Sequence, residues 1–140
     1  AEDAGTYQST EDMVGANIAV EAESAGQKAV EADENLSQAE MVAVGAQSDT
    51  LMEVAAGTSD VAVIDAVMAY ASVGEGTSYS DLVVVDGIEL GKEEYGIGFR
   101  KGSNLVEAVN TALQELTDEG VLDELQQKYP SVLVTLEKSA

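Results

Sequence analysis

The chain has 140 residues, 45% of them hydrophobic, and its 27 acidic and 6 basic side chains give a formal charge of −21. That charge argues against nucleic acid and anionic membrane surfaces as partners, since both bind clustered Lys or Arg. The absence of Cys excludes disulfides and thiolate metal sites, and the absence of His removes the commonest general base. The length suits a single α/β domain over 1–140. The acidity fits a solvated surface, or the steering of a cationic ligand.

Polar residues without periodicity open the chain, so residues 1–12 are predicted to be a leader into the fold. Short apolar runs then recur roughly twenty residues apart, with helix-like segments between them. These runs are Ile18–Val20, Met41–Val44, Val61–Ile64 and Leu82–Val85. Runs that are apolar at successive positions predict strands covered on both faces. Their alternation with helices predicts a parallel sheet of βαβ units.

The segments between the apolar runs carry helix start and stop signals. Ser24 is a candidate cap for a helix through Glu34, and Ser48 for a helix that Gly57 ends. A third, shorter helix is predicted over Val67–Ala71. Each of these helices follows an apolar run, as a βαβ succession requires.

The C-terminal part has a different residue pattern. Large residues alternate with glycine over Tyr95–Phe99, which predicts a further strand. A helix follows, with Ser103 or Asn104 as its cap and Gly120 as its end, and a second helix is predicted over Val121–Tyr129.

These elements predict an α/β fold, a three-layer αβα sandwich with a mainly parallel sheet of about five strands. Residues 13–90 form its core, and residues 91–140 supply the last strand and the two terminal helices. The apolar faces of those helices need a partner. We expect them to dock on the sheet, because the connection from Val85 to Tyr95 is short; the alternative is pairing with another chain, that is, self-association through the C-terminal helices.

Candidate ligand-binding residues lie where two of the predicted strands end. Ser24, Ala25 and Gly26 open a helix, whose unpaired N–H groups and dipole favour an anion such as a carboxylate. Asp65 ends the apolar run before it, at the sheet edge where open α/β sheets bind ligands. The pair would suit a zwitterion, with its carboxylate on the helix and its ammonium on Asp65. The alternative is that Ser24 and Asp65 only cap their helices.

Two more acids, Glu21 and Glu23, project from one face at the end of the first strand. Together with Asp65 they could hold Mg²⁺ or raise one another's pKa, or they are solvated edge acids. The chain has no G-x-S-x-G elbow, P-loop, EF-hand loop or dinucleotide fingerprint. We therefore predict no catalytic residue, no metal site and no cofactor, and do not expect an enzyme.

Three segments, Asn17–Gly26, Gly57–Asp65 and Tyr95–Gly102, resemble in order and spacing the substrate-binding component of polar-amino-acid ABC transporters, a type II periplasmic binding protein. The resemblance covers about Glu11 to Tyr129. It implies the second of two lobes that close on an amino acid, plus the C-terminal return segment, with the first lobe missing. It also implies an extracytoplasmic location in the periplasm or at the cell surface, with a lipid anchor as an option for a full-length form. The transporter's membrane subunits would be its partners.

By motif position, the family's carboxylate-binding loop falls on Glu23, Ser24 and Ala25, and its ammonium-binding Asp falls on Asp65. Glu21 would face the cleft, where it favours a cationic side chain. Three departures weaken the expected affinity. Glu23 stands where the family has Gly, Ala25 lacks the usual hydroxyl, and the first lobe with its Arg clamp does not precede this one.

Two other functions stay open. A phospho-receiver-like switch would use Glu21 and Glu23 to hold Mg²⁺ and Asp65 as the phosphoryl acceptor, with Lys101 as the Lys that follows the fifth strand. Against it, the predicted fourth strand ends Val85-Asp86-Gly87, without the hydroxyl residue that such domains present there. The third reading is a scaffold fragment with no ligand.

Overall fold

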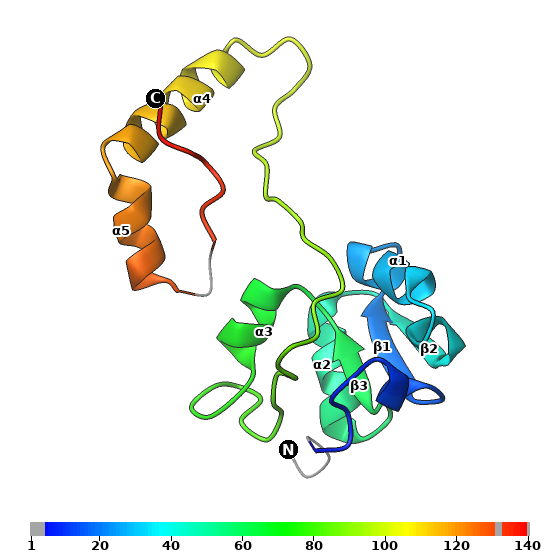
Figure 1. Ribbon diagram of the computed structural model, residues 1–140. Helices are drawn as coiled ribbons and strands as arrows, with labels where there is room; N and C mark the ends of the chain where they lie inside the picture. Colours follow the sequence, from blue (N-terminus) through cyan, green and yellow to red (C-terminus); the bar gives the residue numbers. More distant parts are fainter. Residues whose placement is uncertain (1–4, 131–132, 140) are drawn as a thin grey trace. The chain divides into compact units, whose positions relative to one another are not determined.

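The computed structural model describes residues 5–130 and 133–139 of the chain. The chain forms two compact units, Ala1–Lys92 and Glu93–Ala140. The first contains a sheet with its helices, and the second contains a pair of helices, as Figure 1 shows. In the described parts no helix is long and apolar enough to cross a lipid bilayer.

A parallel sheet organises the first unit. Its three strands, β1 (Asn17–Glu21), β2 (Glu40–Val44) and β3 (Val61–Val63), lie in the order β2-β1-β3. Because β1 is central, its Ile18 pairs with both neighbours, and Ile18, Ala19 and Val20 are fully buried. This confirms the reading of successive apolar residues as a strand covered on both faces.

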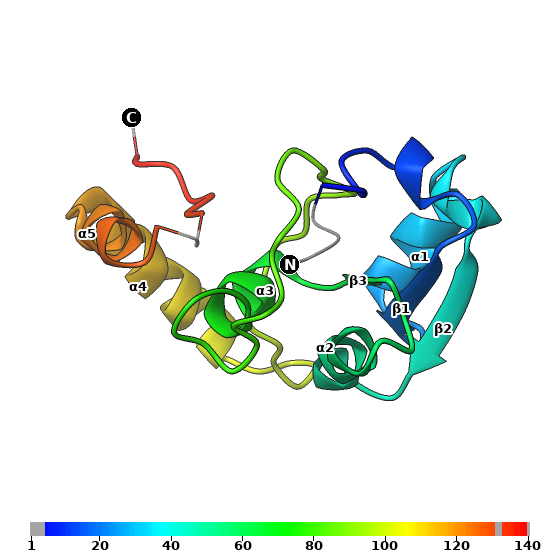
Figure 2. The ribbon, with the colours of Figure 1, turned by 90° about the horizontal axis from the view of Figure 1, so that it is seen from below.

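Two helices cover the sheet. The first crossover, through α1 (Ala25–Ala32), joins β1 to β2, and the second, through α2 (Gln47–Ala56), returns across β1 to β3. Since the two right-handed connections run in opposite directions along the sheet, the helices lie on opposite faces, which Figure 2 shows. Burial of both faces supplies the main apolar stabilisation of this unit.

The core lies mainly on the α1 face. There Ile18 and Val20 cluster with Val30 of α1 and with Leu36, which begins the short 3₁₀ turn Leu36–Gln38. Met13 and Ala16 close the cluster from the N-terminal side, where a second 3₁₀ turn spans Glu11–Met13.

After β3 the chain forms α3 (Ala66–Ser72) and then an extended segment. Ile88 and Leu90 of that segment pack against the core cluster around Ile18. The Asp86-Gly87 turn precedes them, with Gly87 at φ 84°. Because these side chains pack on the core, the first unit extends through this segment to Lys92.

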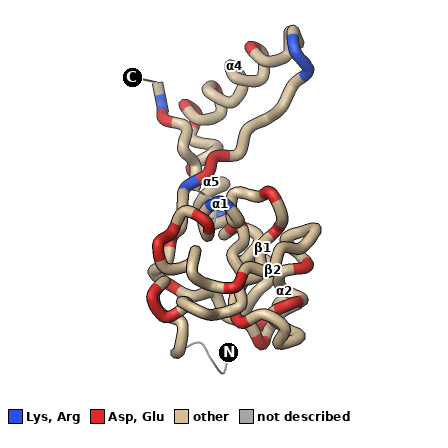
Figure 3. Tube along the Cα trace, turned by 90° about the vertical axis from the view of Figure 1, so that its right-hand side faces the viewer, with Lys and Arg blue, Asp and Glu red and all other residues tan. Residues whose placement is uncertain are grey.

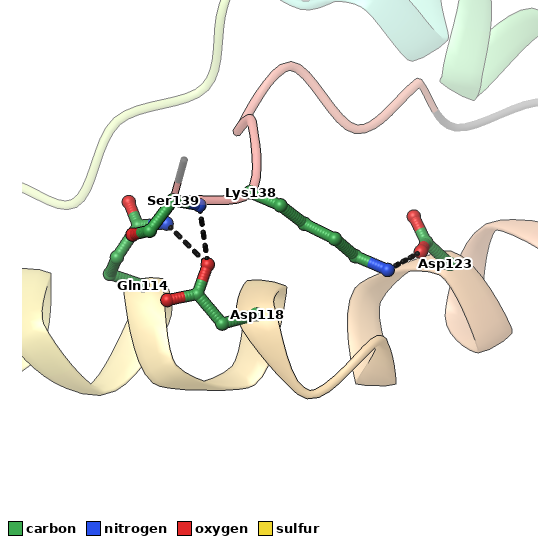
Figure 4. A network of polar contacts seen from close by, with 5 residues as sticks. All are labelled: Gln114, Asp118, Asp123, Lys138 and Ser139. Carbon is green, nitrogen blue, oxygen red and sulfur yellow. Dashed lines mark hydrogen bonds and ion pairs between the residues drawn. The ribbon is translucent and has the colours of Figure 1, made fainter.

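The second unit is built on α4 (Leu105–Asp118) and α5 (Val121–Lys128), joined at Gly120, whose φ of 83° favours glycine. A C-terminal segment folds back along this helix pair, as seen in Figure 4. The Asp118 carboxylate accepts the Ser139 N–H at 2.7 Å and the Gln114 amide at 3.0 Å. Lys138 forms an ion pair with Asp123 at 2.8 Å.

These contacts shift two ionisation equilibria. Hydrogen bonds from the Ser139 backbone, and then from the Gln114 side chain, hold the pKa of Asp118 below its usual value of 3.8. The hydrogen bond to Asp123 raises the pKa of Lys138 above 10.5. Both shifts favour the charged form of the residue at neutral pH, so both support the folded-back segment.

The α/β class and the parallel sheet are confirmed, but the expected count of about five strands is wrong for the described residues. Neither Leu82–Val85 nor Tyr95–Phe99 forms a strand. β3 is only three residues long, so its outer edge offers little backbone for a further strand to pair with. Ile88 and Leu90 instead pack their side chains against the core without joining the sheet. In the second segment, Gly96 and Gly98 weaken strand propensity, and Tyr95 is 83% exposed.

Helix boundaries follow the sequence signals closely. Ser24 caps α1 and Gly57 ends α2 in the left-handed conformation, as predicted. Ser48, however, is not the cap of α2: Ala46 takes that position, and Ser48 lies in the first turn. Docking of the terminal helices on the sheet, in one domain over 1–140, stays a prediction.

Candidate functional site

The order β2-β1-β3 creates a switch point in the sheet. The chain leaves β1 toward β2 on one side, while β3 lies on the other side of β1, so the connection that follows β1 leads away from β3. In open α/β sheets, ligands bind in the crevice outside the carboxyl ends of two such strands. In this sheet the segments at that position are Glu21–Gly26 and Ile64–Ala66, and we call the sheet edge that they form the crevice.

The start of α1 forms one side of the crevice. Ser24 is extended, with φ −75° and ψ 171°, and its hydroxyl oxygen accepts the Gln27 N–H at 3.1 Å. The amides of Ala25 and Gly26 occupy the first two helical positions, which have no intrahelical acceptor. Neither amide donates to another residue in the described ranges. Two open donors at the positive end of α1 can therefore receive an anion.

Gly26 brings this helix start against the end of β3. A Cβ at Gly26 would lie 3.1 Å from the Val63 carbonyl oxygen and 3.5 Å from Val63 Cγ1. Only a residue without a side chain permits that approach without displacing a neighbour. Asp65 follows Val63 by two positions, so the start of α1 and the turn that carries Asp65 lie at the same edge of the sheet. That Ser24–Gly26 and Asp65 bind one ligand together stays a prediction.

Asp65 caps α3, which was the alternative reading of this residue. Its Oδ1 accepts the N–H groups of Val67 at 2.9 Å and Met68 at 3.2 Å, and its side chain is half-buried. Among the described residues no hydrogen bond goes to Oδ2. The capping role thus engages one oxygen and leaves the second available to a cationic group.

Glu23 has an unusual backbone. Its φ of 62° lies in the left-handed region, the only such value among the described residues other than glycine. The conformation is held because the Glu23 N–H donates to Gln27 Oε1 at 2.8 Å. This gives a physical reason for the glycine that the resemblance implies at this position.

Glu21 is half-buried at the end of β1, and its carbonyl accepts the Ser24 N–H at 3.3 Å. Within the residues that the structure describes, no three acidic side chains are grouped closely enough to hold a metal ion. The Mg²⁺ reading of Glu21, Glu23 and Asp65 therefore gains no geometric support. The receiver-like alternative also lacks its fourth strand, since the described segment Leu82–Val85 forms none.

Two glutamines at the site were missed by the sequence reasoning. Gln27 had a signal, since Ser24-x-x-Gln27 has the spacing of a capping box, in which the third helical residue reaches back to the start. Gln47 had none: its Oε1 accepts the Asp65 N–H at 3.1 Å across 18 residues of sequence. A contact of that kind depends on the crossover geometry and leaves no local pattern.

The field around the crevice is strongly negative. Ala1–Lys92 contains eighteen acidic residues against Lys28 and Lys92, which accounts for −16 of the total charge of −21. Figure 3 shows the acidic residues spread along the loops and helices. The start of α1 is a local exception, since its open amides present positive partial charge.

No protein-family model and no curated protein matches the chain. Among solved structures, the chain is similar to the ancestral amino acid-binding protein AncCDT-1, described as a precursor of cyclohexadienyl dehydratase. The TM-score is 0.67 and the identity 26%, over 91% of this chain and 52% of that one. The chain thus spans about half the length of that protein. The match confirms the resemblance to a lobe of a periplasmic binding protein.

Proposed function

We propose that this chain is an amino-acid-binding lobe of an extracytoplasmic solute-binding protein. The observation that supports this most is the close approach of Gly26 to Val63, because it brings the helix start with two open amides to the end of the strand that Asp65 follows, and the Asp65 carboxylate uses one oxygen as a cap. The similarity to an amino acid-binding protein agrees with that chemistry. Binding, rather than catalysis, is proposed because the crevice offers no nucleophile with a base beside it.

In the proposed complex, the ligand carboxylate accepts hydrogen bonds from the amides of Ala25 and Gly26 and from the Ser24 hydroxyl. The ligand ammonium donates to Oδ2 of Asp65. Both interactions are charge-assisted, which makes them stronger than bonds between neutral groups. Glu21 and Glu23 border the site, and Glu23 opposes the carboxylate, so we expect affinity in the millimolar range for this lobe alone.

The wider role follows from the resemblance. A solute-binding protein of this type works outside the cytoplasm and delivers its amino acid to the membrane subunits of an ABC transporter. A first lobe would complete the cleft by closing over the ligand, which normally contributes much of the affinity. Self-association through α4 and α5 is the alternative use of their apolar faces.

The test is an NMR titration of the ¹⁵N-labelled chain with L-alanine and, separately, with propionate, which is alanine without the ammonium group. We expect both ligands to shift the amide signals of Ser24, Ala25 and Gly26, and alanine alone to shift that of Asp65. The highest ligand concentration is about 50 mM, well above a millimolar dissociation constant. If neither ligand shifts these signals at that concentration, the proposal is refuted and the ligand-free scaffold is favoured.

Matched variants separate the two ends of the site. Ala25→Pro removes one amide donor at the first helical position, where proline is tolerated, and the extended Ser24 before it suits a following proline. Ala25→Ser keeps the donor. We expect Ala25→Pro to weaken the affinity for both ligands and Ala25→Ser to leave both affinities unchanged. Asp65→Asn keeps the cap but removes the charge, so it should weaken alanine and leave propionate unchanged.

A further inference from the structure

Gln47 connects the start of α2 to the turn that carries Asp65. Its side-chain carbonyl accepts the Asp65 N–H at 3.1 Å, although the two residues belong to different βα connections. β3 ends at Val63, so the Asp65 amide lies beyond the last residue of the sheet ladder. In the described residues this amide has no other acceptor than Gln47.

Gln47 is itself held in place. The hydroxyl of Thr50, which is fully buried, donates to the Gln47 carbonyl at 2.7 Å. Leu51, 3% exposed, buries the same turn of α2. The Gln47 side chain therefore starts from a fixed backbone, and its free rotation is further limited by half-burial.

The Asp65 turn has three anchors as a result. The carboxylate binds the amides of Val67 and Met68, and the Asp65 amide binds Gln47. The first two anchors tie Asp65 only to its own helix. Gln47 is the anchor that ties this turn to α2, which packs on β1 and β3.

We propose that Gln47 is the positioning residue of Asp65: by holding the Asp65 amide, it sets the carboxylate at the distance from the α1 start that an amino acid requires. This rests on the proposed function, since it assigns Gln47 a role in the same site. Gln47 acts through Asp65, so its removal should affect the recognition of the ammonium group and spare that of the carboxylate.

Amide hydrogen exchange tests the contact without any ligand. Gln47→Ala should speed the exchange of the Asp65 amide about five- to tenfold, the loss expected for one hydrogen bond. Gln47→Glu keeps an acceptor oxygen and should restore most of the protection. The matched control is Gln38→Ala, because Gln38 is an exposed glutamine bonded to the Glu34 carbonyl, at 2.7 Å, away from the crevice. Should Gln47→Ala not fold, Gln47→Asn, one methylene shorter, gives the same readout.

Titration with L-alanine and propionate then tests the role in binding. Gln47→Ala should weaken the affinity for alanine about three- to tenfold and change the affinity for propionate less than twofold. In the Asp65→Asn background, Gln47→Ala should change the affinity for alanine less than twofold, because the side chain that Gln47 positions has lost its charge. Unchanged exchange at Asp65, or equal losses for both ligands, would overturn the positioning role. If the unmodified chain binds neither ligand, the proposed function fails and the binding role of Gln47 with it, while exchange still reports whether Gln47 holds the turn.

Discussion

Glu23 is the residue at which fold and proposed function oppose each other most directly. Its φ of 62° places an L-residue in the left-handed region, which costs about 1–2 kcal/mol. Glu23 also directly precedes Ser24 and the open amides at the start of α1. The substitution Glu23→Gly removes both the strain and the charge, and Glu23→Gln removes only the charge.

The backbone effect can be worked out from these two variants. Glycine relieves about 1–2 kcal/mol of strain but gives up about 0.4–1 kcal/mol through the greater freedom of the unfolded chain. Both variants lose the same carboxylate, so charge effects cancel in the comparison. We therefore expect the free energy of unfolding of Glu23→Gly to exceed that of Glu23→Gln by about 0.5–1 kcal/mol.

The effect on binding should be equal in the two variants. A carboxylate about 5–8 Å from the ligand carboxylate in water opposes it by about 0.5–0.8 kcal/mol. Its removal should tighten propionate roughly two- to fourfold at low salt, with a smaller gain at high salt. Glu34→Gln removes one exposed charge at the far end of α1 and should leave affinity nearly unchanged.

Urea denaturation followed by circular dichroism measures the first effect, and NMR titration with propionate measures the second. Equal stability of Glu23→Gly and Glu23→Gln would show that relief of the left-handed strain does not exceed the about 0.4–1 kcal/mol that glycine gives up in the unfolded chain, against the expected difference. If propionate binds the unmodified chain and neither variant tightens it, the anion does not lie at the start of α1. These two outcomes are independent, so each part of the reasoning can fail alone.

Two further predictions concern packing and pH. Gly26→Val should lower the free energy of unfolding by about 1–3 kcal/mol in urea denaturation, because its Cβ would meet the Val63 carbonyl. Gly45→Val should change it by less than about 0.5 kcal/mol, because its Cβ would meet only Asp49 Oδ2, at 3.9 Å, an ordinary contact. Equal losses would contradict the tight approach. The lowered pKa of Asp118 means that its hold on Ser139 is complete above pH 3.8 and is lost as the pH falls through the lowered value. The Ser139 amide shift should therefore titrate in acid, and Asp118→Asn should abolish that titration; persistence in the variant would assign it to another group.

The three strands of the sheet could be predicted because each is apolar on both faces. Ile18–Val20 has no polar alternation, and the structure buries all three residues completely. Leu82–Val85 shows the limit of the same signal. An apolar run indicates a need for burial, but a strand also needs a free edge to pair with, and here Val83 remains 46% exposed in an extended segment.

The two ends of the candidate site differ in how far the sequence could predict them. The carboxylate end is local: a capping box over residues 23–27 shapes one βα turn, and every contact in it spans four residues or fewer. The ammonium end depends on Gln47, whose contact with Asp65 exists only once α2 has crossed the sheet. Asp65 could therefore be named from its place after an apolar run, whereas the residue that positions it could not.

The same difference means that substitutions at the two ends of the candidate site should have different effects. Substitutions at Glu23, Ser24 or Ala25 act within one turn, so they can tune anion binding while the sheet stays intact. In the proposed complex, the approach of Gly26 to Val63 and the hold of Gln47 on Asp65 would instead set the distance between the groups that bind the two charges of the amino acid, and both contacts join separate parts of the fold. Under this proposal, specificity for a zwitterion would depend on tertiary packing, and affinity for a carboxylate on the local turn.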